Sequence, residues 1–198
     1  MIEVETERLR LRQWIPSDKA PFAALNADKR VMEYFPAPLT REESDAMADR
    51  CQLLIEQHGW GLWAVELKAT TQFVGALGLH IPAAKLPFSP CVEIGWRFAY
   101  PFWRQGLATE AALAALQVGF ERLKLPKIVS FTALINLRSQ ALMERIGMVR
   151  APESFSHPNV SPDSPLSQHC WYHISSDQWQ SRWSAFSRLL MVQEFSIR

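Results

Sequence analysis

The chain has 198 residues, of which 48% are hydrophobic, and its 21 basic residues nearly balance its 20 acidic ones. This length suits one domain, taken as residues 1–198, and the apolar fraction excludes a disordered or collagen-like chain. A net charge of +1 removes the electrostatic reason to expect nucleic acid or an anionic membrane as a partner.

The cysteines and the N-terminus point to a reduced, non-secreted protein. Cys51, Cys91 and Cys170 are widely spaced and form no CxxC pair, so we expect free thiols and no metal site. Residues 1–5 are acidic and no apolar segment follows them. The most apolar window, 111–120, is far shorter than the roughly 20 residues of a membrane-spanning helix. These features predict a cytoplasmic location without a membrane anchor.

The N-terminal half predicts antiparallel strands and two helices. Arg8, Arg10 and Arg12 alternate with mostly apolar residues, and we take them as the solvent face of an edge strand. Thr40 followed three residues later by Glu43 is a capping box, which predicts the start of a helix. The expected elements are a strand at 8–14, helices at 20–25 and 40–57, and a strand hairpin at 61–67 and 73–79.

The C-terminal half predicts a strand–helix–strand unit with two parallel strands. The expected elements are a loop at 81–90, a strand at 91–98, a helix from 106 to about 125, a strand at 128–133, a helix at 137–146, a loop at 152–167, a strand at 168–174 and a C-terminal helix from 176 or 177. Trp179, Trp183, Phe186 and Leu190 share one side of that last helix, which covers either the chain's own core or a second subunit of a homodimer. The predicted fold class is mixed α/β, with a mostly antiparallel sheet around a central βαβ unit.

The turn at Gly106, between a strand and a helix, is a candidate phosphate site. The N–H groups at a helix N-terminus are unpaired and lie at the positive end of the dipole. Gly106 allows close approach of the backbone, and Arg104 adds a positive charge. The segment is neither a P-loop nor GxGxxG, and Glu110 would repel a phosphate unless it faces away. The residues alone leave open whether this is a binding site or only a turn.

Several motifs together resemble the GNAT superfamily of acyl-CoA N-acyltransferases. They are WRQGLATEA at 103–111, NLRS at 136–139 and LMERIGM at 142–148. The segments at 6–12, 26–40 and 156–158 are similar to the branch that contains the ribosomal-protein N-terminal acetyltransferases. The likeness covers about residues 6–174, so the C-terminal helix and tail, 175–198, lie outside the shared pattern. It implies a fold in which the two central parallel strands splay apart.

The resemblance implies that acetyl-CoA is the co-substrate. In the family, backbone amides of a (Gln/Arg)-x-x-Gly-x-(Gly/Ala) loop hold the pyrophosphate, and the pantetheine arm lies between the splayed strands. Trp103 departs from the Gln or Arg of the first loop position, and Asn136 matches an asparagine that touches the arm. The residues so assigned to CoA are Trp96, Arg97, Phe98, Arg104, Gln105, Gly106, Leu107, Ala108, Thr109 and Asn136.

Acetyl transfer to an amine needs a base and donors for the oxyanion. Glu93 is the first candidate for the base, because burial between two apolar neighbours would raise its pKa. The alternative is a solvated carboxylate or a partner for Arg97. His80, at the end of a strand, is the second candidate for the base. A backbone N–H at 96–98 is the candidate oxyanion donor.

The leaving thiolate also benefits from an acid, for which the chain offers a serine. Many family members use a tyrosine where this chain has Met143, which has no proton to give. Ser139 resembles the serine that serves as the acid in the ribosomal branch. The alternative for Ser139 is a hydroxyl that only satisfies the helix N-terminus. His169 and His173 share one side of a strand and are interpreted as packing or pocket lining rather than metal ligands.

The predicted function is transfer of acetyl from CoA to the primary amine of a protein N-terminus or a small molecule, by direct attack. A catalytically idle acyl-CoA-binding or sensor domain is the alternative that Trp103 and Met143 favour, and a nucleotide-binding module is a third. The expected acceptor loops, 26–40, 81–90 and 152–167, are apolar and aromatic rather than acidic. They therefore disfavour a polycationic acceptor.

Overall fold

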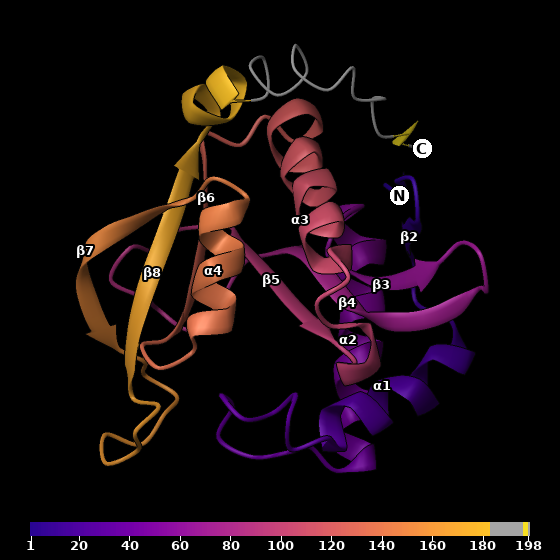
Figure 1. Cartoon of the computed structure of the whole chain (residues 1–198), viewed down its shortest axis with the longest axis horizontal. Coiled ribbons are helices and arrows are strands. Elements are labelled where there is room, and N and C mark those ends of the chain that lie inside the picture. The colour runs from indigo at the N-terminus through magenta and orange to yellow at the C-terminus, as the bar shows by residue number, and fades with distance from the viewer. Residues whose placement is uncertain (183–195, 198) are drawn as a thin grey trace.

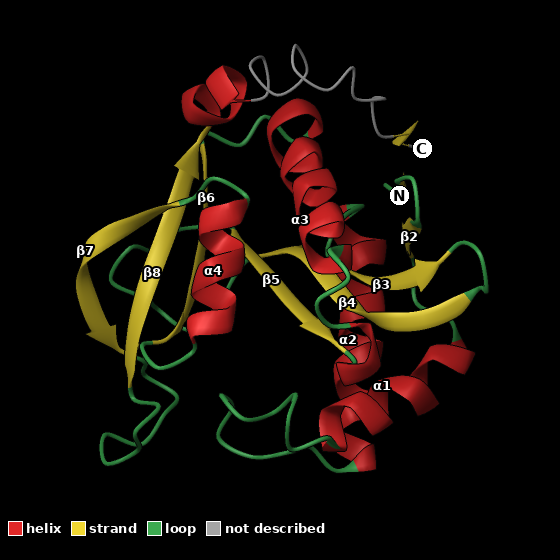
Figure 2. Ribbon diagram, in the orientation of Figure 1, coloured by secondary structure: helices red, strands yellow, loops and turns green. Residues whose placement is uncertain are grey.

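A computed structural model describes residues 1–182 and 196–197 of the chain. These residues form a nine-stranded sheet with helices packed on it (Figures 1 and 2). The strands are β1 (Val4–Glu5), β2 (Leu9–Arg12), β3 (Leu62–Leu67), β4 (Gln72–His80), β5 (Glu93–Phe98), β6 (Lys127–Ala133), β7 (Val149–Ser156), β8 (Gln168–Ser175) and β9 (Ser196–Ile197). The helices are α1 (Lys19–Ala27), α2 (Arg41–His58), α3 (Leu107–Gln117) and α4 (Leu137–Arg145), with shorter turns at Pro16–Asp18, Tyr100–Phe102 and Val118–Arg122.

The strand order is β7-β8-β6-β5-β4-β3-β2-β1-β9. Neighbouring strands are antiparallel except β5 and β6, which are parallel and are joined through α3. The predicted fold class, a mostly antiparallel sheet around one central βαβ unit, is confirmed. No helix in the described part of the chain is both long and apolar enough to span a bilayer.

The two parallel strands separate soon after they meet. Their register contains one pair, Glu93 with Val129, whereas β4 and β5 pair along the whole of β5. The Val129 N–H donates to the carbonyl of Val92, and the Ser130 hydroxyl donates to the carbonyl of Ile94. From there β5 runs away from β6 (Figure 1). The sheet therefore opens at its centre.

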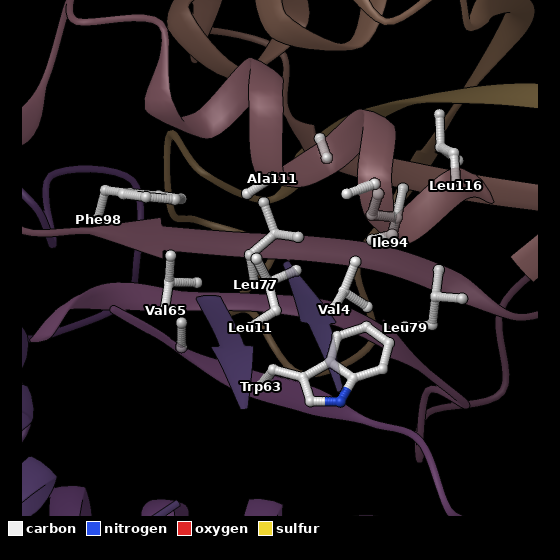
Figure 3. Packing of buried hydrophobic residues seen from close by; sticks show 14 of the residues in the cluster. Val4, Leu11, Trp63, Val65, Leu77, Leu79, Ile94, Phe98, Ala111 and Leu116 are labelled. Carbon is white, nitrogen blue, oxygen red and sulfur yellow. The ribbon is translucent and has the colours of Figure 1, made fainter. Parts of the chain in front are cut away.

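The main core lies between the sheet and α3. Ala111 and Leu116 of α3 are fully buried and lie against Ile94 and Phe98 of β5, with Leu77 of β4 in the same cluster (Figure 3). Burial of these apolar side chains is the main force that holds the helix on the sheet. It also sets the position of the α3 N-terminus relative to β5.

The opposite face of the sheet carries α1 and α2. Successive side chains of a strand point to opposite faces, so Arg97 points away from the face that holds Phe98 and α3. Its guanidinium reaches Asn26 of α1 and the sulfur of Met47 on α2. The open centre of the sheet is thus reached by α3 and α4 from one face and by α1 and α2 from the other.

The helix boundaries follow local signals. Thr40 Oγ1 accepts from the Glu43 N–H, and the Glu43 carboxylate accepts from the Thr40 N–H, so the predicted capping box is confirmed. The last residue of α2 is His58. Its C-cap is Gly59, whose φ of +79° is the left-handed conformation typical of a C-cap. The predicted hairpin of β3 and β4 is also confirmed.

The predicted loop at 152–167 is wrong at its N-terminal end, because β7 extends to Ser156. Proline cannot donate a ladder hydrogen bond and is accepted mainly at edges and irregularities of sheets. Pro152 meets both conditions, since β7 is an edge strand and its register with β8 shifts between Arg150 and Ser154. The loop is therefore confined to residues 157–167.

The interpretation of Arg12 as part of a solvated edge is also wrong. β2 lies between β1 and β3, and the short β1 was not predicted. Arg12 is buried, and it donates to the carboxylates of Asp18 and Glu66 at 2.7 Å each. Two carboxylates contributed by other elements replace the water that an exposed arginine would need.

The C-terminal helix begins at a predicted position, but its cap is Ser175, one residue before the first predicted cap, Ser176. Helical residues start at 176, and the Ser175 hydroxyl accepts from the Gln178 N–H. Trp179 is buried and stacks on Phe120, with 5.7 Å between ring centroids. The other residues of the predicted apolar stripe, Trp183, Phe186 and Leu190, lie outside the described residues.

Candidate active site

A cavity of about 1250 Å³ occupies the region where β5 and β6 separate. Its walls come from β5, β6, the start of α3, α4, the segment 31–36 and the loop after β7. Glu93, His80 and Ser139 line it, as do all the residues predicted to contact CoA except Gln105. The structure thus brings the predicted site residues, from His80 to Ser139 along the chain, to one cavity. The sequence alone placed them on several separate elements.

The wall at the N-terminus of α3 can bind an anion. Arg104 and Gly106 have positive φ angles of 59° and 77°, which turn the loop back into the helix. The next N–H groups, those of Leu107, Ala108 and Thr109, have no acceptor within the helix, and all three residues line the cavity. A helix N-terminus with exposed N–H groups is suited to a phosphate.

Glu110 does not oppose an anion at this wall, because its carboxylate is already neutralised. It accepts from the backbone N–H of Arg8 at 2.9 Å, from Arg8 Nε at 2.6 Å and from the Thr6 hydroxyl at 2.5 Å. Arg8 Nη1 also donates to the carbonyl of Gln105, and a Cβ built on Gly106 would lie 3.4 Å from Arg8 Nη2. Arg8 was not predicted at this site, since 102 residues separate it from Glu110 in the sequence.

Gln105 and Trp103 stabilise the loop by internal hydrogen bonds. The Gln105 side chain donates to the carbonyl of Pro101, and Gln105 does not line the cavity. Trp103 Nε1 donates to the carbonyl of Phe98 at 2.8 Å, which fastens the loop to the end of β5. This bond accounts structurally for a tryptophan at the position where the family pattern has Gln or Arg.

Backbone groups of alternate residues of β5 face the gap between β5 and β6. The Ala99 N–H donates to the carbonyl of Val74 on β4, and antiparallel hydrogen bonding alternates along the strand. In the register of β5 on β4, Gly95 and Arg97 therefore pair with β4, and the N–H groups of Trp96 and Phe98 point to the gap. Arg97 thus has no backbone group facing the gap, unlike the other two residues predicted there.

The two candidates for the base form one pair. His80 Nε2 lies 3.1 Å from Glu93 Oε2, on neighbouring strands in direct register. Glu93 is 9% exposed, and burial raises its pKa, partly offset by the hydrogen bond from His80. His80 Nδ1 is buried without a hydrogen-bond partner among the described residues. Glu93 is therefore neither a solvated carboxylate nor a partner of Arg97.

Asn136 and Ser139 are hydrogen-bonded to each other at the start of α4. Asn136 Nδ2 donates to the hydroxyls of Thr132 and Ser139 at 2.8 and 3.0 Å, and Asn136 Oδ1 accepts from the Ser139 N–H. Because the Ser139 oxygen accepts from Asn136, its own proton can be donated elsewhere. The Asn136 side-chain amide thus caps α4. The predicted contact of Asn136 with CoA stays a prediction. Met143 also lines the cavity and is buried.

A cluster of aromatic side chains forms the wall from β6 to β8. The rings of His157 and His169 lie 4.8 Å apart and both contact Phe131 and Phe155. Burial lowers the pKa of His169 to about 4, so this ring is neutral at pH 7. His169 lines the cavity, whereas His173 does not. Within residues 1–182 and 196–197, no three His, Cys, Asp or Glu side chains are grouped as a metal site requires.

Comparison with known proteins places this geometry in a family. The model of the family described as "Acetyltransferase (GNAT) domain" matches residues 8–149, more than half of the chain. The chain belongs to the GNAT acetyltransferase family. The protein is therefore an acyltransferase, and the splayed strands, the loop at Gly106 and the start of α4 all fall within the matched residues.

Curated relatives and a solved structure match most of this chain. The uncharacterized protein YkkB of Bacillus subtilis is 32% identical over 144 residues, which are 72% of this chain and 83% of YkkB. The FsC-acetyl coenzyme A-N(2)-transacetylase of Aspergillus fumigatus is 28% identical, covering 87% of this chain and 81% of that enzyme. A crystal structure of a GNAT-family acetyltransferase from Bacillus anthracis superposes with a TM-score of 0.73 at 27% identity, covering 88% of this chain and 99% of that one.

The resemblance to the ribosomal branch is weaker. RimL, a ribosomal L7/L12 α-N-protein acetyltransferase solved in complex with CoA, superposes with a TM-score of 0.70 at 16% identity, covering 87% of this chain and 97% of RimL. At that identity the likeness shows the shared fold alone.

Proposed function

We propose that this GNAT enzyme transfers the acetyl group of acetyl-CoA directly to a primary amine, with CoA bound in the gap between β5 and β6. One observation carries the proposal: the sheet, in which β5 and β6 share the single parallel pair Glu93 with Val129, opens into a cavity lined by the residues whose N–H groups are unpaired at the α3 N-terminus. A diphosphate and an extended arm need these two features side by side. The CoA complex of RimL, which has the same fold, supports this use of the cavity.

The CoA contacts divide between the helix and the strand. The N–H groups from Gly106 to Thr109 would hold the pyrophosphate, and the exposed guanidinium of Arg104 would add charge. Arg8 supports this site by neutralising Glu110. The backbone N–H groups of Trp96 and Phe98 would pair with the pantetheine arm or stabilise the oxyanion.

Glu93 is proposed as the base, with His80 as its partner. An alkyl amine has a pKa of about 10.4 and must lose a proton before it can attack the thioester carbonyl. A buried carboxylate whose pKa is raised accepts that proton, directly or through one water. The hydrogen bond from His80 Nε2 holds the Glu93 carboxylate in place on the α1–α2 side of the strand.

Ser139 is proposed as the acid for the departing thiolate, whose ordinary pKa is about 8.5. Asn136 orients the serine by donating to its oxygen and accepting from its N–H. Asn136 therefore acts as a positioning residue in this scheme. Met143, which cannot donate a proton, lies in the same wall and leaves Ser139 as the hydroxyl at this end of α4.

The proposal is tested in two steps with the full chain. A thermal shift with CoA tests the cavity, and release of free CoA from acetyl-CoA in the presence of small amines and of peptides with free N-termini tests transfer. The peptides are included because the segments at 6–12 and 156–158 are similar to the ribosomal branch. CoA binding without release with any amine would identify an idle acyl-CoA-binding domain. Protection by ATP but not by CoA would identify a nucleotide-binding module.

A further inference from the structure

Arg97 is a half-buried cation in the wall of the cavity, and no carboxylate of the described residues lies within 4 Å of it. On its own strand, Glu93 is paired with His80. On α1 and α2 it meets the amide of Asn26 and the sulfur of Met47, both neutral groups. Burial without a counter-charge lowers the pKa of Arg97 to about 10, so the guanidinium remains charged at pH 7.

The other cavity-lining arginines differ from Arg97 in this respect. Arg138 forms an ion pair with Glu33. Arg104 and Arg145 are exposed, so water compensates their charge. A half-buried cation that lacks both an anion and full hydration is costly unless a ligand supplies the missing charge. Arg97 is the side chain on which such a ligand would have the largest effect.

The orientation of Arg97 leaves one edge of its guanidinium open. Nη1 donates to Asn26 Oδ1 at 2.5 Å, and Asn26 is itself held by donating to the buried Ser44 hydroxyl at 2.8 Å. Phe35 covers one face of the guanidinium, 4.1 Å from ring centroid to Cζ. The Nε–H and Nη2–H groups have no acceptor among the described residues. These two parallel donors match the two oxygens of a carboxylate.

The residue of β5 between Arg97 and the proposed base on this face of the strand is a glycine, Gly95, which has no side chain. Glu93, Gly95 and Arg97 lie on one face of β5, with about 13 Å between the first and last Cα atoms. A Cβ built on Gly95 would meet the His80 ring, with Cε1 at 3.5 Å and Nδ1 at 3.9 Å, and Glu93 Oε1 at 3.9 Å, all at ordinary contact distances. Glu93, Gly95 and Arg97 all line the same cavity, so one ligand can reach both the Glu93 carboxylate and Arg97.

We infer that the amine acceptor carries a carboxylate that pairs with the Nε–Nη2 edge of Arg97 while its amine lies at Glu93. This inference rests on the proposed function and names the substrate class of that same site. The carboxylate belongs either to a free amino acid or to an acidic side chain of a peptide. Because Arg97 repels cations, an amine without a carboxylate, such as a polyamine, is a poorer substrate.

The test uses acceptors that differ only in the carboxylate. Ornithine is putrescine with one carboxylate added, and lysine is cadaverine with one added. The third pair consists of a peptide with an acidic side chain and the same peptide in which that side chain is an uncharged amide. We expect kcat/KM for CoA release to be at least about tenfold higher for the carboxylated member of at least one pair, which corresponds to about 1.4 kcal/mol. The pair that shows the preference identifies the source of the carboxylate.

Variants then assign the preference to Arg97. Arg97→Gln is expected to reduce it to about twofold or less, through KM of the carboxylated acceptor, and Arg97→Lys is expected to retain part of it. Arg41→Gln, which removes an exposed arginine paired with Asp45 on α2, is the matched control and should retain it. An unchanged CoA thermal shift shows that each variant is folded. A wild-type enzyme without the preference, or a preference that survives in Arg97→Gln, overturns the inference while transfer itself stands.

Binding separates the failure of this inference from the failure of the proposed function. If CoA binds but no amine is acetylated, the proposed function fails, and calorimetry of ornithine and putrescine with the CoA complex decides about Arg97. Binding of ornithine that is at least tenfold tighter than that of putrescine, and that is lost in Arg97→Gln, supports the carboxylate site. Equal binding of the two compounds refutes it.

Discussion

The Glu93 carboxyl is the group on which the rate is expected to depend most. It is 9% exposed, lies 3.1 Å from His80 Nε2 and has a pKa raised by burial. Glu93→Gln keeps the size of the side chain and one acceptor oxygen but removes the site that takes the proton. A positioned base contributes about 10²- to 10⁴-fold, so we expect kcat to fall by that factor, or about 2.7–5.4 kcal/mol of transition-state stabilisation.

The pH dependence has opposite signs for rate and for stability. The wild-type rate should fall as pH drops through the raised pKa of Glu93, because protonation removes the base. The folded chain binds this proton more tightly than the unfolded chain, so stability is lost as pH rises through the folded pKa. Glu93→Gln should therefore have a higher Tm than wild type at pH 7. The difference should shrink toward about pH 4.3, the ordinary pKa of glutamate.

The assay is CoA release at saturating acetyl-CoA across the pH range, with Tm measured in the same buffers. Glu56→Gln, which replaces an exposed carboxylate on α2 that accepts from Gln52, is the matched control and should behave as wild type in both measurements. If the Glu93→Gln variant kept the wild-type kcat and the acid limb of the pH–rate profile, Glu93 would have no role as the base.

Three further substitutions test the rest of the site and the fold. Gly106→Ala should raise the Kd of CoA about tenfold by calorimetry, because an alanine at φ +77° is strained by about 1–2 kcal/mol; an unchanged Kd would place the pyrophosphate elsewhere. Ser139→Ala should lower kcat by about 10²-fold with CoA affinity unchanged, whereas full turnover would mean that water protonates the thiolate. Arg12→Met leaves Asp18 buried without a cation and leaves Glu66 with Arg10 alone, at 3.4 Å, and should lower the free energy of unfolding in urea by about 3–5 kcal/mol. A loss below about 1 kcal/mol would indicate a network as weak as an exposed ion pair.

Signals that act within a few residues allowed the elements to be predicted from the sequence. The Thr40–Glu43 box and the glycine at 106 each determine a helix end through bonds or φ angles of adjacent residues. Hydrophobic periodicity predicted the β3–β4 hairpin and the crossover through α3. The motif at 103–111 led us to propose an anion site at the α3 N-terminus, since a strand–loop–helix junction is itself a local feature.

Contacts between distant residues were decided only by the tertiary structure. His80 and Glu93 were separate candidates until the register of β4 on β5 brought them to 3.1 Å. Arg97 was assigned to CoA, but the pleat of β5 directs its side chain to Asn26, 71 residues away in sequence. Pro152 suggested a loop because the sequence does not reveal which strand lies at an edge. Local bonds are specified by the residues that make them, whereas register, edges and facing side chains depend on how the whole sheet assembles.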